Sequence, residues 1–176
     1  RGVPQDYVEA MRWFRRAADQ GFAAAQNNLG HMFSEGRGVS QDYFAAVKWY
    51  RAAAEQGDAD ARYNLGLMYN KGHGVPQDYA MAAKWYRTAA AQGHAMAQSN
   101  LGAMYGNGHG LTQNYVLAHM WFNLAASQGE ALSLGSGDGA SGNRDKIARR
   151  MTPAQIARAQ ELAAQCLAST YQDCAE

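Results

Sequence analysis

The chain repeats itself with a period of 36 residues over most of its length. At this step, glycines and tryptophans recur in fixed columns: Gly2, Gly38, Gly74 and Gly110, and Trp13, Trp49, Trp85 and Trp121. A fixed period of this size is typical of arrays in which similar supersecondary units stack side by side and bury a continuous core. The repeat therefore predicts an array of stacked units rather than an enzyme built around one pocket.

The composition predicts that these units are helical. Hydrophobic residues make up 47% of the chain, and many of them are alanine, which is a strong helix former. Runs of Val, Ile and Thr, which are typical of strands, are missing. We therefore expect an all-α fold.

Each repeat contains two amphipathic helical segments. The first runs from Asp42 to Gln56, with small and aromatic residues on one helical stripe, and Gly57 ends it. Asp or Asn stands at the N-cap position of each copy: Asp6, Asp42, Asp78 and Asn114. The second segment runs from Asp60 to Asn70 with Gly66 in its middle, which costs about 1 kcal/mol against alanine. Recurrence of this glycine indicates that another helix packs there, and the glycine-rich connector supplies a C-cap and a turn.

The combined pattern resembles the Sel-one-like repeat family over residues 2 to about 131. The motifs that carry the resemblance are Gly-Val-Pro-Gln-Asp-Tyr, Ala-x-x-Trp-Tyr-Arg-x-Ala-Ala, Gln-Gly and Ala-x-x-Asn-Leu-Gly-x-Met-Tyr. The family is similar to the tetratricopeptide repeats. This implies an all-α superhelix, a right-handed solenoid of antiparallel helix pairs whose Leu-Gly helices line the concave face.

Three segments are expected along the chain. Residues 1–131 hold three full copies and a partial fourth, residues 132–142 form a Gly/Ser-rich loop, and residues 143–176 form C-terminal capping helices. Thr152-Pro153 starts the last helix, with Gln155 completing a capping box. Arg1 aligns with the connector, so we also expect further repeats before it in the native protein.

Charge and motifs exclude several function classes. The formal net charge is +1 with no long block of one sign, which argues against a nucleic-acid partner. No apolar run is long enough to insert into a membrane. The five histidines lack metal-ligand spacing, so no metal site is expected. Residues 137–142 match G-x-G-x-x-G without a strand pattern before them, so no cofactor is expected.

The two cysteines, Cys166 and Cys174, leave two alternatives open. A continuous helix would hold them about 12 Å apart, but a turn after Ser169 or Thr170 would allow a disulfide. A disulfide would indicate an oxidising compartment, such as the periplasm or the cell exterior. Two unpaired buried thiols would say nothing about location.

The columns that change between copies indicate where function lies. On the Leu-Gly helix they are spaced four, three and one residues apart, which places them on one helix face, called the stripe here. Such a face suits a binding groove, although an exposed surface without a task also varies. The candidate binding residues on and beside it are Asn27, His31, Glu35, Tyr63, Leu67, Asn70, Lys71, Met96, Ser99 and Asn107. Two basic columns, which begin at Arg12 and Arg15, are interpreted as solvated helix surface instead.

These observations predict a non-catalytic scaffold that binds a protein or peptide partner through the stripe. Similarity to the family implies the same, since its members resemble adaptor proteins. The alternative is a weak hydrolase, because some cysteine-rich relatives are described as β-lactamase-like or penicillin-binding. Those relatives are dense in paired cysteines, whereas this chain has one pair at its end.

Overall fold

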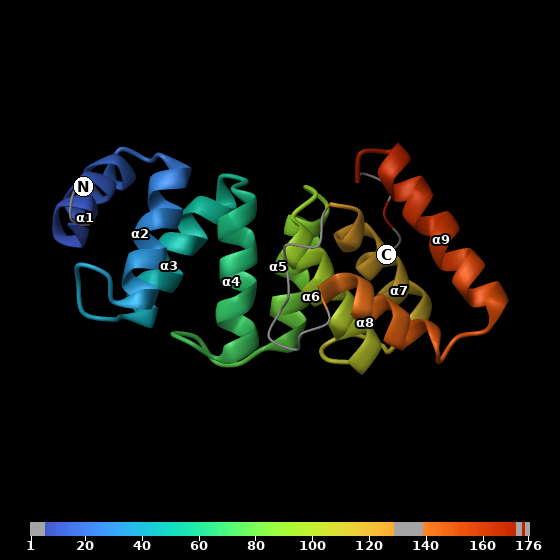
Figure 1. Ribbon diagram of the computed structural model, residues 1–176. Coiled ribbons are helices and arrows are strands. Elements are labelled where there is room, and N and C mark those ends of the chain that lie inside the picture. Colours follow the sequence, from blue (N-terminus) through green and yellow to red (C-terminus); the bar gives the residue numbers. More distant parts are fainter. Residues whose placement is uncertain (1–5, 129–138, 172–173, 175–176) are drawn as a thin grey trace, which may run out of the picture. The chain divides into compact units, whose positions relative to one another are not determined.

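The computed structural model describes residues 6–128, 139–171 and 174, and every regular element in this part is an α-helix (Figure 1). The all-α repeat fold expected from the sequence is therefore confirmed. In chain order the helices are α1 (Tyr7–Asp19), α2 (Ala23–Glu35), α3 (Tyr43–Glu55), α4 (Ala59–Lys71), α5 (Tyr79–Ala90), α6 (Ala95–Asn107), α7 (Tyr115–Ser127), α8 (Gly139–Ala148) and α9 (Pro153–Ala168). They form two compact units, Arg1–Asp78 with α1 to α4 and Tyr79–Glu176 with α5 to α9.

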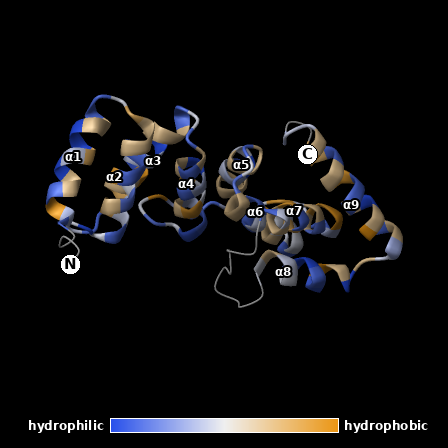
Figure 2. Ribbon diagram, turned by 45° about the horizontal axis from the view of Figure 1, so that its top comes forward, coloured by the Kyte–Doolittle hydropathy of each residue, from blue (hydrophilic) through white to orange (hydrophobic). Residues whose placement is uncertain are grey.

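Inside each unit the helices pack in chain order. In the first unit each helix contacts the next, and in the second α5 contacts α6, α6 contacts α7, and α7 contacts both α8 and α9. Figure 2 shows hydrophobic colour along α6 and α7, whereas much of α8 is coloured as hydrophilic. The second helix of each of the first three copies starts sixteen residues after the first helix, but α8 starts twenty-four residues after α7. Helix α8 thus takes the place of the second helix of the fourth copy.

The predicted loop over 132–142 is wrong in its last part. Residues 139–142 form the first turn of α8, and the rest of that segment lies outside the described residues. Gly and Ser are weak helix formers, but packing of α8 against α7 decides the local structure, with Ala140 buried.

Helix ends follow the chemistry read from the sequence. The carboxylate of Asp42 accepts a hydrogen bond from the Ala45 N–H at 3.0 Å, and Asp6 and Asn114 cap α1 and α7 in the same way. The second helices end on Gly36, Gly72 and Gly108, each left-handed with φ near +70°. These predicted caps are confirmed.

The connector glycine column exists because the chain comes too close to its neighbour for a side chain. A Cβ on Gly74 would overlap the carbonyl group of Tyr43 and lie 2.9 Å from the Phe44 nitrogen. Gly38 and Gly110 meet the start of α1 and of α5 in the same manner. Each connector therefore rests on the first turn of the preceding first helix.

The core consists of the invariant small and aliphatic columns. Leu29, Leu65 and Leu101 are fully buried, and mid-helix Gly30 packs against the Tyr50 ring as expected. The exposure of the tryptophan column differs between copies. Trp121 is 1% exposed, whereas Trp13 is 59% exposed because no described helix covers that face of α1.

A hydrogen bond between a buried and an exposed glutamine, which the sequence reading missed, ties the helix pairs together. The Gln56 side-chain amide donates to the Gln26 oxygen at 2.7 Å, and the Gln26 amide donates to the Ala18 carbonyl. Gln128 and Gln98 repeat this arrangement in the second unit, at 2.8 Å. These bonds satisfy polar groups beside the core, where an unpaired group would be costly.

The last helix closes the second unit. Thr152 and Gln155 form the predicted capping box of α9, and Cys166 is buried. After Ser169 the chain turns through the left-handed residues Thr170 and Tyr171. This turn brings Cys174 back, and the structure joins it to Cys166 in a disulfide with Cα atoms 4.6 Å apart.

Candidate binding grooves

The predicted stripe residues lie on α2, α4 and α6, and they differ in exposure. His31, Glu35, Lys71 and Asn107 are exposed, Asn27, Leu67, Asn70 and Met96 are half-buried, and Tyr63 and Ser99 are buried. Six of the ten line one of two grooves, one in each unit. They are His31, Glu35, Leu67 and Lys71 in the first unit, and Ser99 and Asn107 in the second. The structure does not place Asn27, Tyr63, Asn70 or Met96 in the lining of either groove.

The first groove lies between α2 and α4 and has a volume of about 250 Å³. Tyr50 lies at its floor, where its hydroxyl is 3.2 Å from the Ser34 hydroxyl. Burial raises the pKa of Tyr50 to about 12, against the opposing effect of the Ser34 hydrogen bond. The floor is therefore neutral, and both hydroxyls are already paired with each other.

The rim of this first groove is also held in place. The ring of His73 stacks on Tyr43 with centroids 4.3 Å apart, and the Gln41 amide donates to the Tyr43 hydroxyl at 3.1 Å. At the other end, the Asn64 amide donates to the Asn27 side-chain oxygen at 2.9 Å, joining α4 to α2. Hydrogen bonds within the protein thus already occupy some of the polar side chains along the stripe in this unit.

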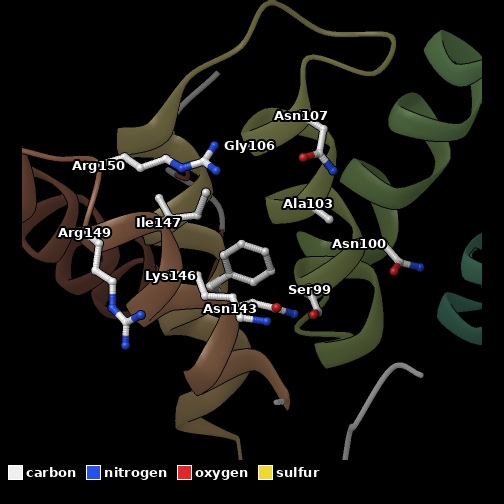
Figure 3. Close-up of a pocket in the computed structure, with 11 residues that line it drawn as sticks. Ser99, Asn100, Ala103, Gly106, Asn107, Asn143, Lys146, Ile147, Arg149 and Arg150 are labelled. Carbon is white, nitrogen blue, oxygen red and sulfur yellow. The ribbon is translucent and has the colours of Figure 1, made fainter. Parts of the chain in front are cut away.

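The second groove lies between α6 and α8 and is larger, with a volume of about 610 Å³ (Figure 3). It is called the α6–α8 groove below. One wall comes from α6, the other from α8 and the turn after it, and Phe122 of α7 also lines it. Its lining residues are Ser99, Asn100, Ala103, Gly106, Asn107, Phe122, Asn143, Lys146, Ile147, Arg149 and Arg150.

The two grooves occupy the same place in the repeat. Both helices have a buried alanine in their first turn, and aligning Ala61 with Ala140 in the sequence gives a register between α4 and α8. In that register the lining residues of α4 correspond one by one to lining residues of α8: Asn64 to Asn143, Leu67 to Lys146, Met68 to Ile147, and Lys71 to Arg150. Both grooves therefore lie between successive second helices of the array.

Gly106 explains how α8 approaches α6. A Cβ at this position would lie 3.1 Å from the Ile147 Cδ1, so the glycine leaves the space that the Ile147 side chain uses. The equivalent residues in the earlier copies are Ser34 and Asn70. The column Ser34/Asn70/Gly106 was predicted as part of the binding stripe. In the third copy its residue, Gly106, also packs against α8.

Cations dominate the wall that α8 contributes. Lys146, Arg149 and Arg150 line the α6–α8 groove, and none of its lining residues in the described part of the chain is Asp or Glu. Arg150 lies near Tyr115, with 3.5 Å between its Nη1 and the phenol oxygen and 6.0 Å from its guanidinium carbon to the ring centroid. The sequence reading missed these residues, although the run Arg-Asp-Lys-Ile-Ala-Arg-Arg at 144–150 is the densest basic stretch in the chain.

A buried histidine lies behind α8. His119 of α7 is 3% exposed, and burial together with the positive charge of Arg144 lowers its pKa, while Asp145 opposes this effect. Arg144 pairs with Asp145 at 2.9 Å and also contacts the Asn123 side-chain oxygen. The contact of Arg144 with Asn123 joins α8 to α7, and none of these residues lines the α6–α8 groove.

The basic column that begins at Arg15 has a structural role, which differs from the solvated surface expected for it. Arg51 donates to the Tyr69 hydroxyl at 3.0 Å, and Arg87 donates to the Tyr105 hydroxyl at 2.8 Å, linking the two helices of a pair. Arg15 pairs with Asp19 as expected, at 3.7 Å. Within the described residues, no cluster of three His, Cys, Asp or Glu side chains could hold a metal ion. None of the helices described is long and apolar enough to cross a membrane.

Two solved structures with the same fold come from bacteria. A Sel1 repeat protein from Oxalobacter formigenes superimposes with a TM-score of 0.67 at 33% identity, covering 94% of this chain and 72% of that one. The protein c5321 of uropathogenic Escherichia coli, a protective antigen with an SLR fold, has a TM-score of 0.66 at 27% identity. That alignment covers 93% of this chain but 42% of c5321, so this chain spans less than half of that protein.

Sequence comparison identifies the repeat itself. No curated protein sequence matches the chain significantly. The model of the Sel1 repeat matches four consecutive segments, which are residues 1–22, 23–58, 59–94 and 95–130. Since these segments cover most of the chain, and the predicted resemblance is thereby confirmed, the chain belongs to the Sel1 repeat family.

Proposed function

We propose that this chain is a non-catalytic scaffold that binds a protein or peptide partner through the grooves between its second helices. The Sel1 repeat is a scaffold fold that typically serves protein interaction and is generally non-enzymatic. No observation on the described residues favours the hydrolase alternative.

The observation that carries the proposal is the repeated groove. The same face of the repeat is hollowed in each unit, and in both units part of the lining comes from columns that vary between copies, such as that of Lys71 and Asn107, beside invariant columns such as that of Asn64 and Asn100. Residues that only pack are uniform between copies, as Leu29, Leu65 and Leu101 are. A hollow that recurs while its lining changes is suited to recognition of a specific partner rather than to packing.

The chemistry of the lining supports a peptide ligand. Both grooves combine side-chain amides with apolar surface: Asn64 with Leu67 in the first, and Asn143 with Ile147 in the second. Amides can donate to and accept from a peptide backbone, and apolar surface contributes binding free energy by burial. This combination of side-chain amides with apolar surface is the reason for proposing a peptide as the partner.

Peptides selected from a random display library on the purified chain provide the test. We expect the affinity of a selected peptide to fall at least about fivefold, on the order of 1 kcal/mol, in His31→Ala, Lys71→Ala or Asn107→Ala. The matched controls are Lys48→Ala and Lys84→Ala, which change exposed residues of α3 and α5. Selection of no binding peptide, or equal losses in control and groove variants, would refute the proposal.

A further inference from the structure

We infer that the α6–α8 groove binds the backbone of an extended peptide segment, which enters between Ser99 and Asn143 and places one aliphatic side chain between the two walls. This inference rests on the proposed function and deepens it, because it names the peptide backbone as the feature that is recognised. Three observations carry it: polar side chains without a partner, a hydrogen bond that the first groove makes and this groove lacks, and the length of the groove.

An internal hydrogen bond joins the two walls of the first groove, and the equivalent pair in the α6–α8 groove does not form one. In the first unit the Asn64 amide donates to the Asn27 side-chain oxygen at 2.9 Å. Ser99 stands in the column of Asn27, and Asn143 stands where α4 has Asn64. A serine side chain is shorter than an asparagine side chain, and the Ser99 hydroxyl bonds to no group among the described residues. The place of the internal bond is therefore open to a ligand.

The burial of Ser99 makes its missing partner significant. Its side chain is 1% exposed and lines the groove, yet its hydroxyl is unpaired within the described part of the chain. Such a hydroxyl is costly, because it has lost its contact with water without gaining another partner. A ligand group that bonds to Ser99 removes this cost, so the groove favours a ligand with a polar group at this depth.

Three asparagine side chains of the lining are also available to a ligand. Asn100 and Asn107 of α6 and Asn143 of α8 make no side-chain hydrogen bond within the described residues. A carboxamide offers an acceptor oxygen and two N–H donors, and a peptide backbone presents a C=O and an N–H group at each residue. These side chains therefore match a peptide backbone without any requirement for charge on the ligand.

The dimensions of the groove fit about four residues of extended peptide. Ser99 and Asn107 are eight residues apart on α6, which corresponds to about 12 Å along the helix. An extended peptide advances about 3.3 Å per residue, so about four residues span this length. Figure 3 shows Ser99 and Asn143 near one end and Asn107 near the other, with Ala103 and Ile147 between them. The small Ala103 lets a backbone approach α6, and Ile147 offers apolar surface to an aliphatic side chain.

The test uses an uncharged probe, so that charges near the groove do not decide the result. The probe is acetyl-Thr-Thr-Leu-Thr-Thr-amide, and its binding to the isotope-labelled, oxidised full chain is followed by NMR titration. One control peptide has esters in place of the two amides that flank the leucine, which removes two N–H donors, and a second has glycine in place of the leucine. We expect the probe to bind at least about fivefold more tightly than either control and to shift the resonances of α6 and α8. Equal binding of the probe and the ester peptide, or no binding of the probe at millimolar concentration, would overturn the inference.

Variants locate the binding between Ser99 and Asn143. Ser99→Asn rebuilds the bond that the first groove contains, so it is expected to leave the thermal unfolding midpoint unchanged or raised while weakening the probe at least about tenfold. Its matched control is Ser127→Asn, the same change at an exposed position of α7 outside the groove lining. Asn143→Leu removes the other carboxamide at similar size and is expected to weaken the probe about fivefold, whereas Asn28→Leu on the exposed surface of α2 has no effect. If Ser99→Asn and Asn143→Leu bind the probe like their controls, the site is elsewhere and the inference fails.

The outcomes separate this inference from the proposed function. If display-selected peptides depend on His31, Lys71 or Asn107 but keep their affinity in Ser99→Asn and Asn143→Leu, only the backbone site is wrong. If no peptide of any kind depends on a groove residue, both fail. A labelled chitotetraose that binds more tightly than the probe and loses affinity in Ser99→Asn would overturn the inference in favour of a saccharide.

Discussion

Replacing Gly30 by alanine is expected to destabilise the first unit, although alanine is the better helix former. The substitution alone gains about 1 kcal/mol from helix propensity. A Cβ at this position, however, would lie 2.7 and 2.8 Å from two carbons of the Tyr50 ring. Carbon atoms are in ordinary contact at about 3.5 to 4.0 Å, so the ring must move by roughly 1 Å.

That movement has a cost that can be estimated from the environment of the ring. Tyr50 is 1% exposed, so there is little free volume to receive it, and overpacking of a core costs about 1 to 3 kcal/mol. Its hydroxyl also pairs with Ser34, which adds about 1 kcal/mol if the bond is lost. After the gain in propensity is subtracted, Gly30→Ala is expected to lower the free energy of unfolding by about 1 to 3 kcal/mol.

Gly106→Ala is the matched control, because it makes the same chemical change in an equivalent second helix. The nearest atom to a new Cβ there is the Ile147 Cδ1 at 3.1 Å, the far end of a flexible side chain, and the next is at 3.7 Å. We expect the free energy of unfolding to stay unchanged or to rise by up to about 1 kcal/mol. Urea unfolding followed by circular dichroism measures both variants, with hydrogen exchange of α2 and α3 to locate the effect. A Gly30→Ala chain as stable as wild type, or equal shifts in both variants, would refute the argument.

Three further predictions concern the second unit. Cys174→Ser, or reduction of the wild type, is expected to lower the free energy of unfolding by about 2 to 3 kcal/mol, because the disulfide closes a loop across eight positions. Urea unfolding with and without reductant measures this loss, and equal stability in both conditions would contradict the prediction. The lowered pKa of His119 means that the unfolded chain binds the proton more readily, so stability is expected to fall as the pH drops through about 6.5, by at most about 1.4 kcal/mol per pH unit. Urea unfolding at several pH values should show a flatter profile for His119→Leu, and an unchanged slope would be evidence against this role. Arg87→Gln removes the bond to Tyr105 and is expected to cost about 0.5 to 1.5 kcal/mol, whereas Lys84→Gln in the neighbouring basic column stays within about 0.5 kcal/mol. Similar thermal shifts for the two variants would show that this column is ordinary solvated surface.

Features that depend on local chemistry could be predicted from the sequence. Asp42 as an N-cap, Gly72 as a left-handed C-cap and Thr152 with Gln155 as a capping box each involve groups within a few residues of one another. The disulfide between Cys166 and Cys174 is one of the two alternatives that the sequence left open, and the turn that it requires follows Ser169, one of the two positions considered. In each case one residue type satisfies a backbone requirement that exists at that position in any helix.

The α6–α8 groove could not be predicted from the sequence. One of its walls is α8, and α8 does not start at the position that the 36-residue period would give for the next second helix. The period gives no position for α8, which starts later than the second helices of the other copies. Ser99 could be named as a candidate from its variable column, but its burial and its unpaired hydroxyl depend on tertiary contacts. The sequence shows that Lys146 and Arg150 are basic. It does not show which face of α8 lies against α6, so it could not assign these residues to a groove.

The terminal position of α8 also explains why its groove is the basic one. In the register set by Ala61 and Ala140, Arg144 and Asp145 stand where an internal second helix has Leu65 and Gly66. In the first copy, the glycine of this column, Gly30, receives the ring of Tyr50 from the following first helix. Helix α9, which follows α8, packs against α7 instead, so these two positions of α8 can carry polar residues, which pair with each other at 2.9 Å.

Release from this packing requirement has a consequence for recognition. A helix that ends a stack needs a polar outer face, and the residues that provide it add charge near the groove. On the other face of the same helix, Lys146 stands where α4 has Leu67, which adds one positive charge to the lining, whereas Arg150 in the place of Lys71 keeps the charge. In the internal groove, Ser34 already pairs with Tyr50 and Asn64 with Asn27, so we expect a partner to gain fewer polar contacts there than in the α6–α8 groove.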